Sequence, residues 1–297
     1  MKYLRLVMLA FAATALSAAP IRLENDSAVA EISPETGRIT AWRLKKGENL
    51  LWNNHTGNLS HQSAPGWKNY GGDKVWLVPQ KQRYNAFGND APDPVIDGQP
   101  WRVAEHTPYS VVLKSGRSDA LHCMVTRTIV LDRSRPELTV TARAERFAPS
   151  PLPVELWTVT QARRPEYGLL GLDSDFYPGD RRWRLMRKSG TPVQVGEFGD
   201  LLEVRFGQKG WEKISSWGRL VAAVYPGVIF LQEFDAPPEG CFPERCTAQI
   251  FVGEEYLELE SHSALCHLKA GEAIESTIRW RLVPRPAERN AAADREA

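Results

Sequence analysis

The chain has 297 residues, of which 42% are hydrophobic and 25% are charged, and its formal charge is +1. This length is enough to bury a large core in one or two domains, and all-β proteins of this size are often a single domain. The mixed, nearly neutral charge excludes the basic surface that nucleic acids and anionic membranes require, so we expect a small neutral partner and no nucleic acid.

The N-terminus has the pattern of a secretory signal peptide. Lys2 and Arg5 precede an apolar run over residues 6–16, and small residues follow at 17–19. We therefore expect residues 1–19 to be removed from an exported protein, which is periplasmic or secreted.

The folded part of the chain is expected to span residues 20–284 as one domain. No later segment approaches the roughly 20 apolar residues of a membrane span, so we expect no membrane insertion after signal cleavage. Residues 285–297 are rich in alanine and charge and lack apolar periodicity. They are expected to form a disordered tail.

Short alternating runs of apolar and polar residues, broken by Gly, Pro, Asn and Asp, follow one another from residue 21 onward. Such alternation is typical of half-buried β-strands, and no stretch with helical periodicity competes with it. Many short strands predict an all-β sandwich or barrel. The strand candidates are residues 28–32, 39–44, 110–114, 121–131, 138–144, 154–161, 201–206, 220–225, 228–234, 247–252, 256–262 and 274–283.

Polar and aromatic residues crowd together between residues 67 and 80. Paired glycines follow Tyr70 and allow a tight turn, and Asp73, Lys74 and Trp76 come directly after them. Indole rings stack on the C–H faces of a pyranose, and the polar groups can hydrogen-bond its hydroxyls. This segment is therefore a candidate sugar-binding loop. Tryptophan is equally a core residue in β-sandwiches, so burial stays an alternative for each ring.

Other chemistries receive little support from the sequence. The six histidines show no H-x-H or H-E-x-x-H spacing, so we expect no metal. There is no G-x-S-x-G elbow, and the paired glycines lack the following helix of a phosphate-binding loop. We therefore expect no cofactor.

Export would allow disulfides, and the four cysteines permit three full pairings. Cys241 and Cys246 flank a turn-rich segment and are expected to pair. Cys123 and Cys266 lie in strand-like patterns, where a buried free thiol is as plausible as a bridge.

The C-terminal region contains two strand patterns, at residues 256–262 and 274–283, which we expect to form an antiparallel pair. In the first pattern Leu257 and Leu259 share one face, while Glu258, Glu260 and His262 share the other. The carboxylates therefore point away from the local apolar stripe. They could meet a ligand or could simply be solvated.

The order L-x-L-E-S, a variable stretch, L-x-x-G-E and a final aromatic strand resembles the end of galactose mutarotase (aldose 1-epimerase) and its relatives. The resemblance implies a large antiparallel β-supersandwich, with Glu260 in the position of the catalytic base. It also implies a sugar or oligosaccharide as ligand. Together with residues 70–76, the segment from Trp157 to Gln161 resembles a bacterial branch of the superfamily, so Trp157 and Gln161 join the candidate site.

Two departures from the mutarotase pattern concern the acid. Tyr70 stands where the superfamily places a sugar-contacting His before its glycines, and no His lies in residues 154–161. Mutarotation needs a base at the anomeric hydroxyl and an acid at the ring oxygen. Lys74, Tyr70, His122 and His262 are the acids that the sequence offers.

Three interpretations follow from these observations. The first is a carbohydrate-active enzyme of epimerase type with Glu260 as general base. The second is a sugar-binding protein without activity, and the third is a structural envelope protein that kept the fold but lost the pocket. The fold cannot decide among them, because one sandwich can carry several functions.

Overall fold

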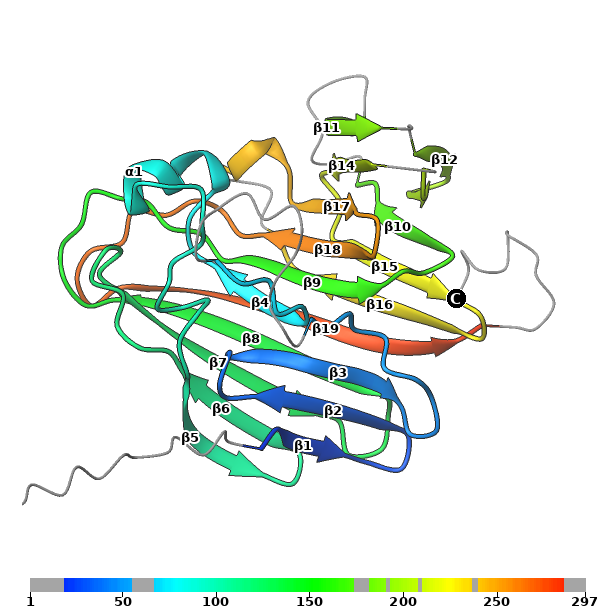
Figure 1. Cartoon of the computed structure of the whole chain (residues 1–297), viewed down its shortest axis with the longest axis horizontal. Helices are drawn as coiled ribbons and strands as arrows, with labels where there is room; N and C mark the ends of the chain where they lie inside the picture. The colour runs from blue at the N-terminus through cyan, green and yellow to red at the C-terminus, as the bar shows by residue number, and fades with distance from the viewer. Residues whose placement is uncertain are drawn as a thin grey trace, which may run out of the picture.

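The computed structural model describes residues 19–54, 67–173, 182–190, 193–207, 210–236 and 240–285. Within these residues the chain forms two large antiparallel sheets that pack against each other (Figure 1). The expected signal peptide, apart from residue 19, and the expected tail beyond residue 285 lie outside the described residues.

The first sheet has nine described strands. Its order is β1 (Ile21–Glu24), β2 (Ala28–Ser33), β3 (Arg38–Leu44), β4 (Asp73–Trp76), β9 (Trp157–Arg163), β18 (Tyr256–His262), β17 (Ala248–Val252), β14 (Gly210–Ser216) and β11 (Trp183–Gly190).

The second sheet has ten described strands. Its order is β12 (Gln194–Phe198), β13 (Leu201–Arg205), β10 (Tyr167–Gly171), β15 (Leu220–Tyr225), β16 (Val228–Phe234), β19 (Ala273–Pro284), β8 (Glu137–Arg146), β7 (Cys123–Leu131), β6 (Ser110–Lys114) and β5 (Arg102–Thr107).

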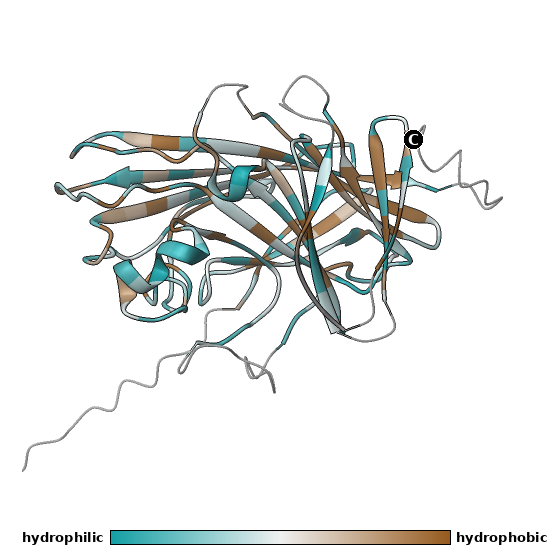
Figure 2. Ribbon diagram, turned by 90° about the horizontal axis from the view of Figure 1, so that it is seen from above, coloured by the Kyte–Doolittle hydropathy of each residue, from teal (hydrophilic) through white to brown (hydrophobic). Residues whose placement is uncertain are grey.

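Alternating polarity explains most of these strands. Strands β6, β15, β16 and β18 have the predicted bounds, and the expected hairpin of β7 and β8 is present, with Cys123 opposite Arg146 and Leu131 opposite Leu138. Hydrophobic and hydrophilic segments follow one another along the strands (Figure 2). The apolar residues that face inward meet between the sheets, where the rings of Trp42 and Phe230 lie 6.4 Å and 5.0 Å from that of Trp280.

Two expectations about pairing are wrong. Strands β18 and β19 do not pair: β18 lies between β17 and β9 in the nine-stranded sheet, and β19 lies between β16 and β8 in the other. The predicted binding loop also contains strand β4, which pairs with β9 over its whole length. Both features depend on contacts between distant segments, which local alternation does not encode.

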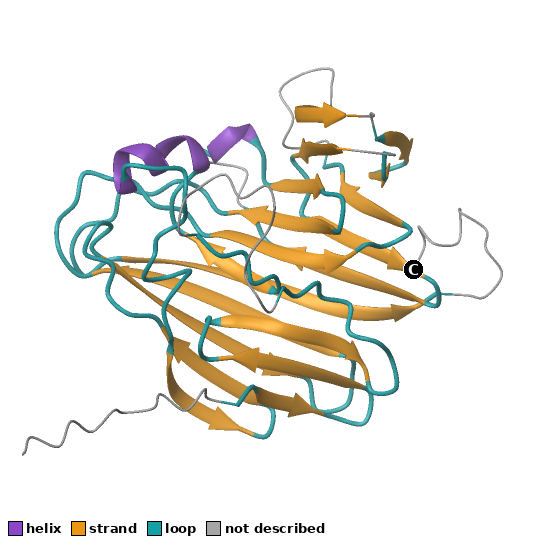
Figure 3. Ribbon diagram, in the orientation of Figure 1, coloured by secondary structure: helices purple, strands orange, loops and turns teal. Residues whose placement is uncertain are grey.

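Helical structure is limited to short pieces, drawn in purple in Figure 3. They are η1 (Gln80–Gln82), α1 (Arg83–Phe87) and η3 (Pro243–Arg245). Among the described residues, no helix has the length and apolar character needed to cross a bilayer.

The expected disulfide between Cys241 and Cys246 is not formed. All four cysteines are free thiols, and those of Cys241 and Cys246 face different surroundings. Cys241 is exposed, whereas Cys246 is buried, with its sulfur 3.1 Å from Nε2 of Gln249. Because η3 turns Cys246 inward, closeness in sequence does not bring the two sulfurs together.

A buried ion pair joins the two sheets. The guanidinium of Arg127 on β7 donates to the Asp73 carboxylate on β4, and both side chains are at most 1% exposed. Thr160 Oγ1 donates to Asp73 Oδ2 at 2.7 Å, and Gln232 Nε2 on β16 donates to Thr160 Oγ1 at 2.9 Å. This network fixes the inward direction of Asp73.

The glycines before β4 allow it to enter the sheet. Gly71 and Gly72 have φ angles of 81° and 67°, which side chains disfavour. A Cβ atom on Gly71 would lie 2.3 Å from the carbonyl oxygen of Trp52, and one on Gly72 would lie 2.4 Å from that of Ile39. These positions therefore need glycine.

We predict that Asp73→Asn destabilises the protein by about 3–5 kcal/mol, because it leaves the buried Arg127 charge without its counter-ion. Glu145→Gln is the matched control, since the Arg143–Glu145 pair has both side chains 41% exposed. It should cost less than about 1 kcal/mol. Urea unfolding followed by circular dichroism measures both changes, and equal effects would contradict a special role for the buried pair.

Candidate functional site

The outer face of the nine-stranded sheet carries the candidate site. In the register of β4, β9 and β18, Lys74 lies opposite Val159, and Val159 lies opposite Glu260. Opposed residues of antiparallel strands point to the same face. Lys74, Val159 and Glu260 therefore form one row across three strands.

Two parallel rows flank this central row on the same face. On one side Trp76 lies opposite Trp157, which lies opposite His262. On the other side Gln161 lies opposite Glu258. The structure thus brings together the predicted site residues from all three sequence segments: Lys74, Trp76, Trp157, Gln161, Glu258, Glu260 and His262.

The Glu260 carboxylate is fully buried and is held through one of its two oxygens. Trp157 Nε1 and Lys213 Nζ each lie 2.8 Å from Oε2, which fixes the orientation of the group. The second oxygen, Oε1, is buried and has no hydrogen-bond partner among the described residues. A buried acceptor without a partner costs folding free energy unless a ligand or a water molecule donates a hydrogen bond to it.

Glu258 provides a second carboxyl group in the neighbouring row. Gln161 Nε2 donates to its Oε1 at 2.8 Å. Burial, and next the charge of Glu260, raise the pKa of Glu258 from 4.5 to about 7. This carboxyl group can therefore gain or lose a proton near neutral pH.

Lys74 is a buried cation at the end of the central row opposite to Glu260. Its side chain is almost completely enclosed, and its Nζ has no hydrogen-bond partner among the described residues. The Nζ atom lies 5.2 Å from the centre of the Trp76 ring. Burial, and next the charge of Arg38, lower the pKa of Lys74 from 10.5 to about 8.

Residues that the sequence did not single out complete the cluster. Lys213 pairs with Glu260. A hydrogen bond of 2.9 Å joins Glu155 Oε2 and His262 Nδ1. His262 Nε2 lies 3.1 Å from Gln249 Oε1, and its ring stacks on Trp157 with centroids 5.2 Å apart. The sequence could have pointed to Glu155, because it is a charged residue within the predicted strand at residues 154–161. Lys213 carried no such signal.

Two side chains cover this face. The Trp67 ring packs on the edge of the apolar cluster of Trp76, Trp157 and Val159, with its centroid 6.3 Å from that of Trp76, and its Nε1 donates to Asp97 Oδ2 at 2.7 Å. The Arg83 guanidinium of α1 lies 4.3 Å from the centre of the Trp76 ring and 5.1 Å from that of Trp157.

Two predicted ligand contacts lie elsewhere. Asp73 faces the interior, where it pairs with Arg127, because alternation along β4 places it on the face opposite to Lys74 and Trp76. Tyr70 precedes the strand, and its ring lies 5.9 Å from the Arg38 guanidinium. It lines a cavity of about 740 Å³ that also includes Trp67, Phe87 and Asp97.

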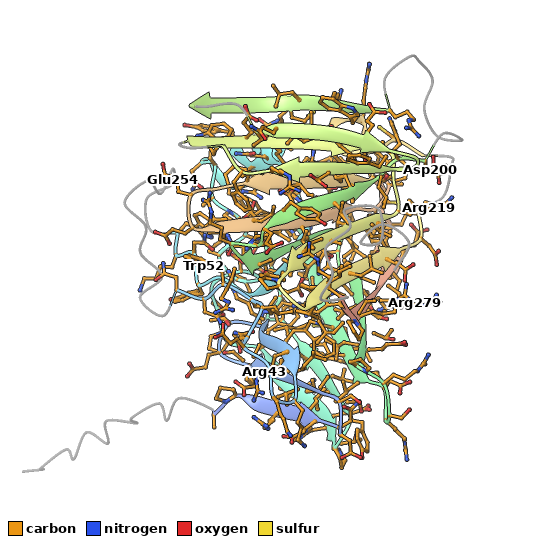
Figure 4. The ribbon with its side chains drawn as sticks, turned by 90° about the vertical axis from the view of Figure 1, so that its right-hand side faces the viewer. Arg43, Trp52, Asp200, Arg219, Glu254 and Arg279 are labelled. Atoms are coloured by element: carbon orange, nitrogen blue, oxygen red, sulfur yellow. The ribbon has the colours of Figure 1, made fainter. Side chains whose placement is uncertain are left out.

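A second cavity, of about 880 Å³, lies away from the cluster and is bordered by Asp200, Arg219 and Arg279. These residues are on one side of the molecule in Figure 4, with Trp52 and Glu254 on the other. Trp52 belongs to the side of the cluster, since it packs against Tyr256 of β18. No group of three or more potential metal ligands occurs among the residues that the structure describes.

Solved structures with similar folds were found by comparison. A protein from Escherichia coli K12, provisionally described as an aldose 1-epimerase, aligns with a TM-score of 0.56 and 14% identity over 90% of this chain and 99% of its own. A galactose mutarotase-like protein from Lactobacillus casei aligns with a TM-score of 0.54 and 11% identity, over 89% and 100% of the two chains.

A galactose 1-epimerase from Lactobacillus acidophilus aligns with a TM-score of 0.50 and 10% identity, over 89% and 94% of the two chains. Neither a protein-family model nor a curated protein sequence matches the chain. The two sheets define an antiparallel β-supersandwich. Its architecture is the galactose mutarotase-like fold, which confirms the fold that the sequence resemblance implied.

We predict that Lys74→Met stabilises the protein at pH 7 by roughly 2 kcal/mol. The folded-state pKa of Lys74 is lowered, so the unfolded chain binds more protons between pH 8 and 10.5 and the buried ammonium opposes folding below that window. The gain should therefore shrink as the pH rises toward 10.5. Urea unfolding at pH 7 and pH 10 tests this, with exposed Lys46→Met as the neutral control.

Proposed function

We propose that this protein is an exported, carbohydrate-active enzyme of the mutarotase type, with Glu260 as the general base. One observation carries the proposal: the carboxylate of Glu260 is held by two donors at Oε2 while its buried Oε1 has no partner among the described residues. That oxygen is the natural acceptor for the proton of an anomeric hydroxyl.

The surroundings of Glu260 suit a sugar ring. Val159 forms an apolar floor between Lys74 and Glu260, and the indoles of Trp76 and Trp157 border it. Gln161 and Glu258 offer hydrogen-bonding groups on the opposite border, and Glu258 is the part of this cluster that reaches solvent. Aromatic faces rimmed by polar groups match the alternating C–H and O–H surfaces of a pyranose.

A sugar would reach this floor by displacing Trp67. The indole N–H of Trp67 donates to the Asp97 carboxylate, and the ring packs edge-on against Trp76, which borders the floor. Sugar binding should therefore shift the Trp67 indole N–H resonance in the NMR spectrum, with the signal assigned through Trp67→Phe. The indole signals of Trp42 and Trp280, which lie in the core, should stay unchanged.

The central prediction concerns anomer interconversion. Glu260→Gln should slow the catalysed interconversion of aldose anomers by about 100-fold or more, because an amide cannot take the proton. NMR exchange measurements with a panel of aldoses, corrected for the buffer rate, would show this loss. Glu275→Gln changes an exposed glutamate of β19 and should leave the rate unchanged.

A non-catalytic role is the second candidate. The ion pair of Glu260 with Lys213 and its complete burial favour a structural or sugar-binding function. Sugar binding with identical interconversion rates in the wild type and Glu260→Gln would indicate a binding protein. The absence of binding by every aldose tested would favour the structural role.

A further inference from the structure

Neither of the two candidate histidines, His122 and His262, is free to act as the acid at this site. Both ring nitrogens of His262 are engaged, Nδ1 with Glu155 at 2.9 Å and Nε2 with Gln249 at 3.1 Å. His122 lies before β7, where its Nδ1 is 2.7 Å from the carbonyl oxygen of Pro149 and its ring packs against Phe147. Neither side chain presents an unused ring nitrogen to the floor at Val159.

Tyr70 is excluded by its position. Its ring lies against Arg38 and lines the cavity of about 740 Å³ with Trp67 and Phe87, and it is not part of the row of Lys74, Val159 and Glu260. Of the four acids that the sequence offers, only Lys74 therefore shares the central row with Glu260.

The spacing of this row suits a group that works opposite a base. Neighbouring strands lie about 4.8 Å apart, so the Cα atoms of Lys74 and Glu260 are about 10 Å apart across Val159. A sugar ring over Val159 would have the carboxylate on one side and the ammonium on the other. The Lys74 Nζ is buried and unpartnered among the described residues, which leaves it a proton to donate.

We propose that Lys74 is the general acid of this site and protonates the ring oxygen of a bound aldose. This inference rests on the proposed function, since an acid is required only if Glu260 acts as a base. It assigns to a lysine on β4 a task that neither His122 nor His262 is placed to perform.

The proposed step balances in protons and bonds. Glu260 takes the proton of the C1 hydroxyl, whose O–H electrons form the C1 carbonyl as the bond between C1 and the ring oxygen breaks. The ring oxygen takes a proton from the Lys74 ammonium. The open-chain sugar then rotates about its C1–C2 bond. The hydroxyl formed from the former ring oxygen attacks the other face of C1 and returns its proton to Lys74. Glu260 returns its proton to the C1 oxygen.

The charges around Lys74 support a proton donor near neutral pH. Burial and the positive charge of Arg38 on β3 lower the pKa of Lys74. The carboxylates of Glu258 on β18, Asp97 and the inward-facing Asp73 raise it, but by less than burial lowers it. The resulting pKa of about 8 keeps the amine protonated at pH 7 and allows it to release the proton readily.

The test is a pH profile of anomer interconversion for the aldose that the wild type converts fastest. Wild-type kcat/KM should fall above about pH 8, where Lys74 loses its proton. Lys74→Met should lower kcat about 100-fold or more and lose that alkaline decrease. Lys74→Arg should be equally slow, because a guanidinium keeps the charge but does not release its proton.

Chemical rescue separates catalysis from a merely structural role. Methylammonium added to Lys74→Ala should restore part of the lost rate, whereas it should not affect Lys46→Met. NMR titration of the Lys74 amine in the wild type gives a readout that needs no variant. An alkaline decrease that does not coincide with this titration would overturn the assignment.

The outcomes distinguish the two proposals. If Glu260→Gln is slow while Lys74→Met keeps the wild-type kcat and pH profile, the role of Lys74 is wrong and the function of Glu260 stands. If the wild type converts no aldose faster than buffer does, the proposed function fails, and the role of Lys74 fails with it.

Discussion

The buried ion pair between Asp73 and Arg127 is the constraint on which the candidate site depends. It joins β4 of one sheet to β7 of the other, and it holds Asp73 toward the interior. Because side chains alternate along a strand, an inward Asp73 forces Lys74 and Trp76 to the outer face. The pairing of all four β4 residues with β9 and the buried network around Asp73 together orient this short strand, and its outward residues meet those of β9 and β18.

Several buried polar groups on the outer face of the nine-stranded sheet lower the stability of the folded protein. Lys74 Nζ, Glu260 Oε1 and Arg83 Nη2 are all buried without hydrogen-bond partners among the described residues, and each costs free energy in the folded protein. A structural surface would gain by replacing these groups with apolar side chains. Lys74 and Glu260 lie in one row of the sheet, and Arg83 of α1 lies over the tryptophans beside that row.

The acid and the base would differ in how the protein prepares them. Two donors orient Glu260 through one oxygen, so its role would depend on geometry. Lys74 Nζ has no hydrogen-bond partner among the described residues, and burial together with the charge of Arg38 lowers its pKa to about 8. Glu155 and Gln249 hold the His262 ring, which stacks on the face of Trp157, and Trp157 in turn donates to Glu260.

Alternating hydrophobicity in the sequence determined the all-β class, most strands and the outward direction of Glu258 and Glu260, because period-two patterning is local. It could not determine that β18 and β19 lie in different sheets, that Asp73 faces inward or that Cys241 and Cys246 stay apart. Lys213 and Arg83 entered the cluster only through the fold. Register and sheet order arise from contacts between segments far apart in the chain, so the tertiary structure alone decided which residues share one face.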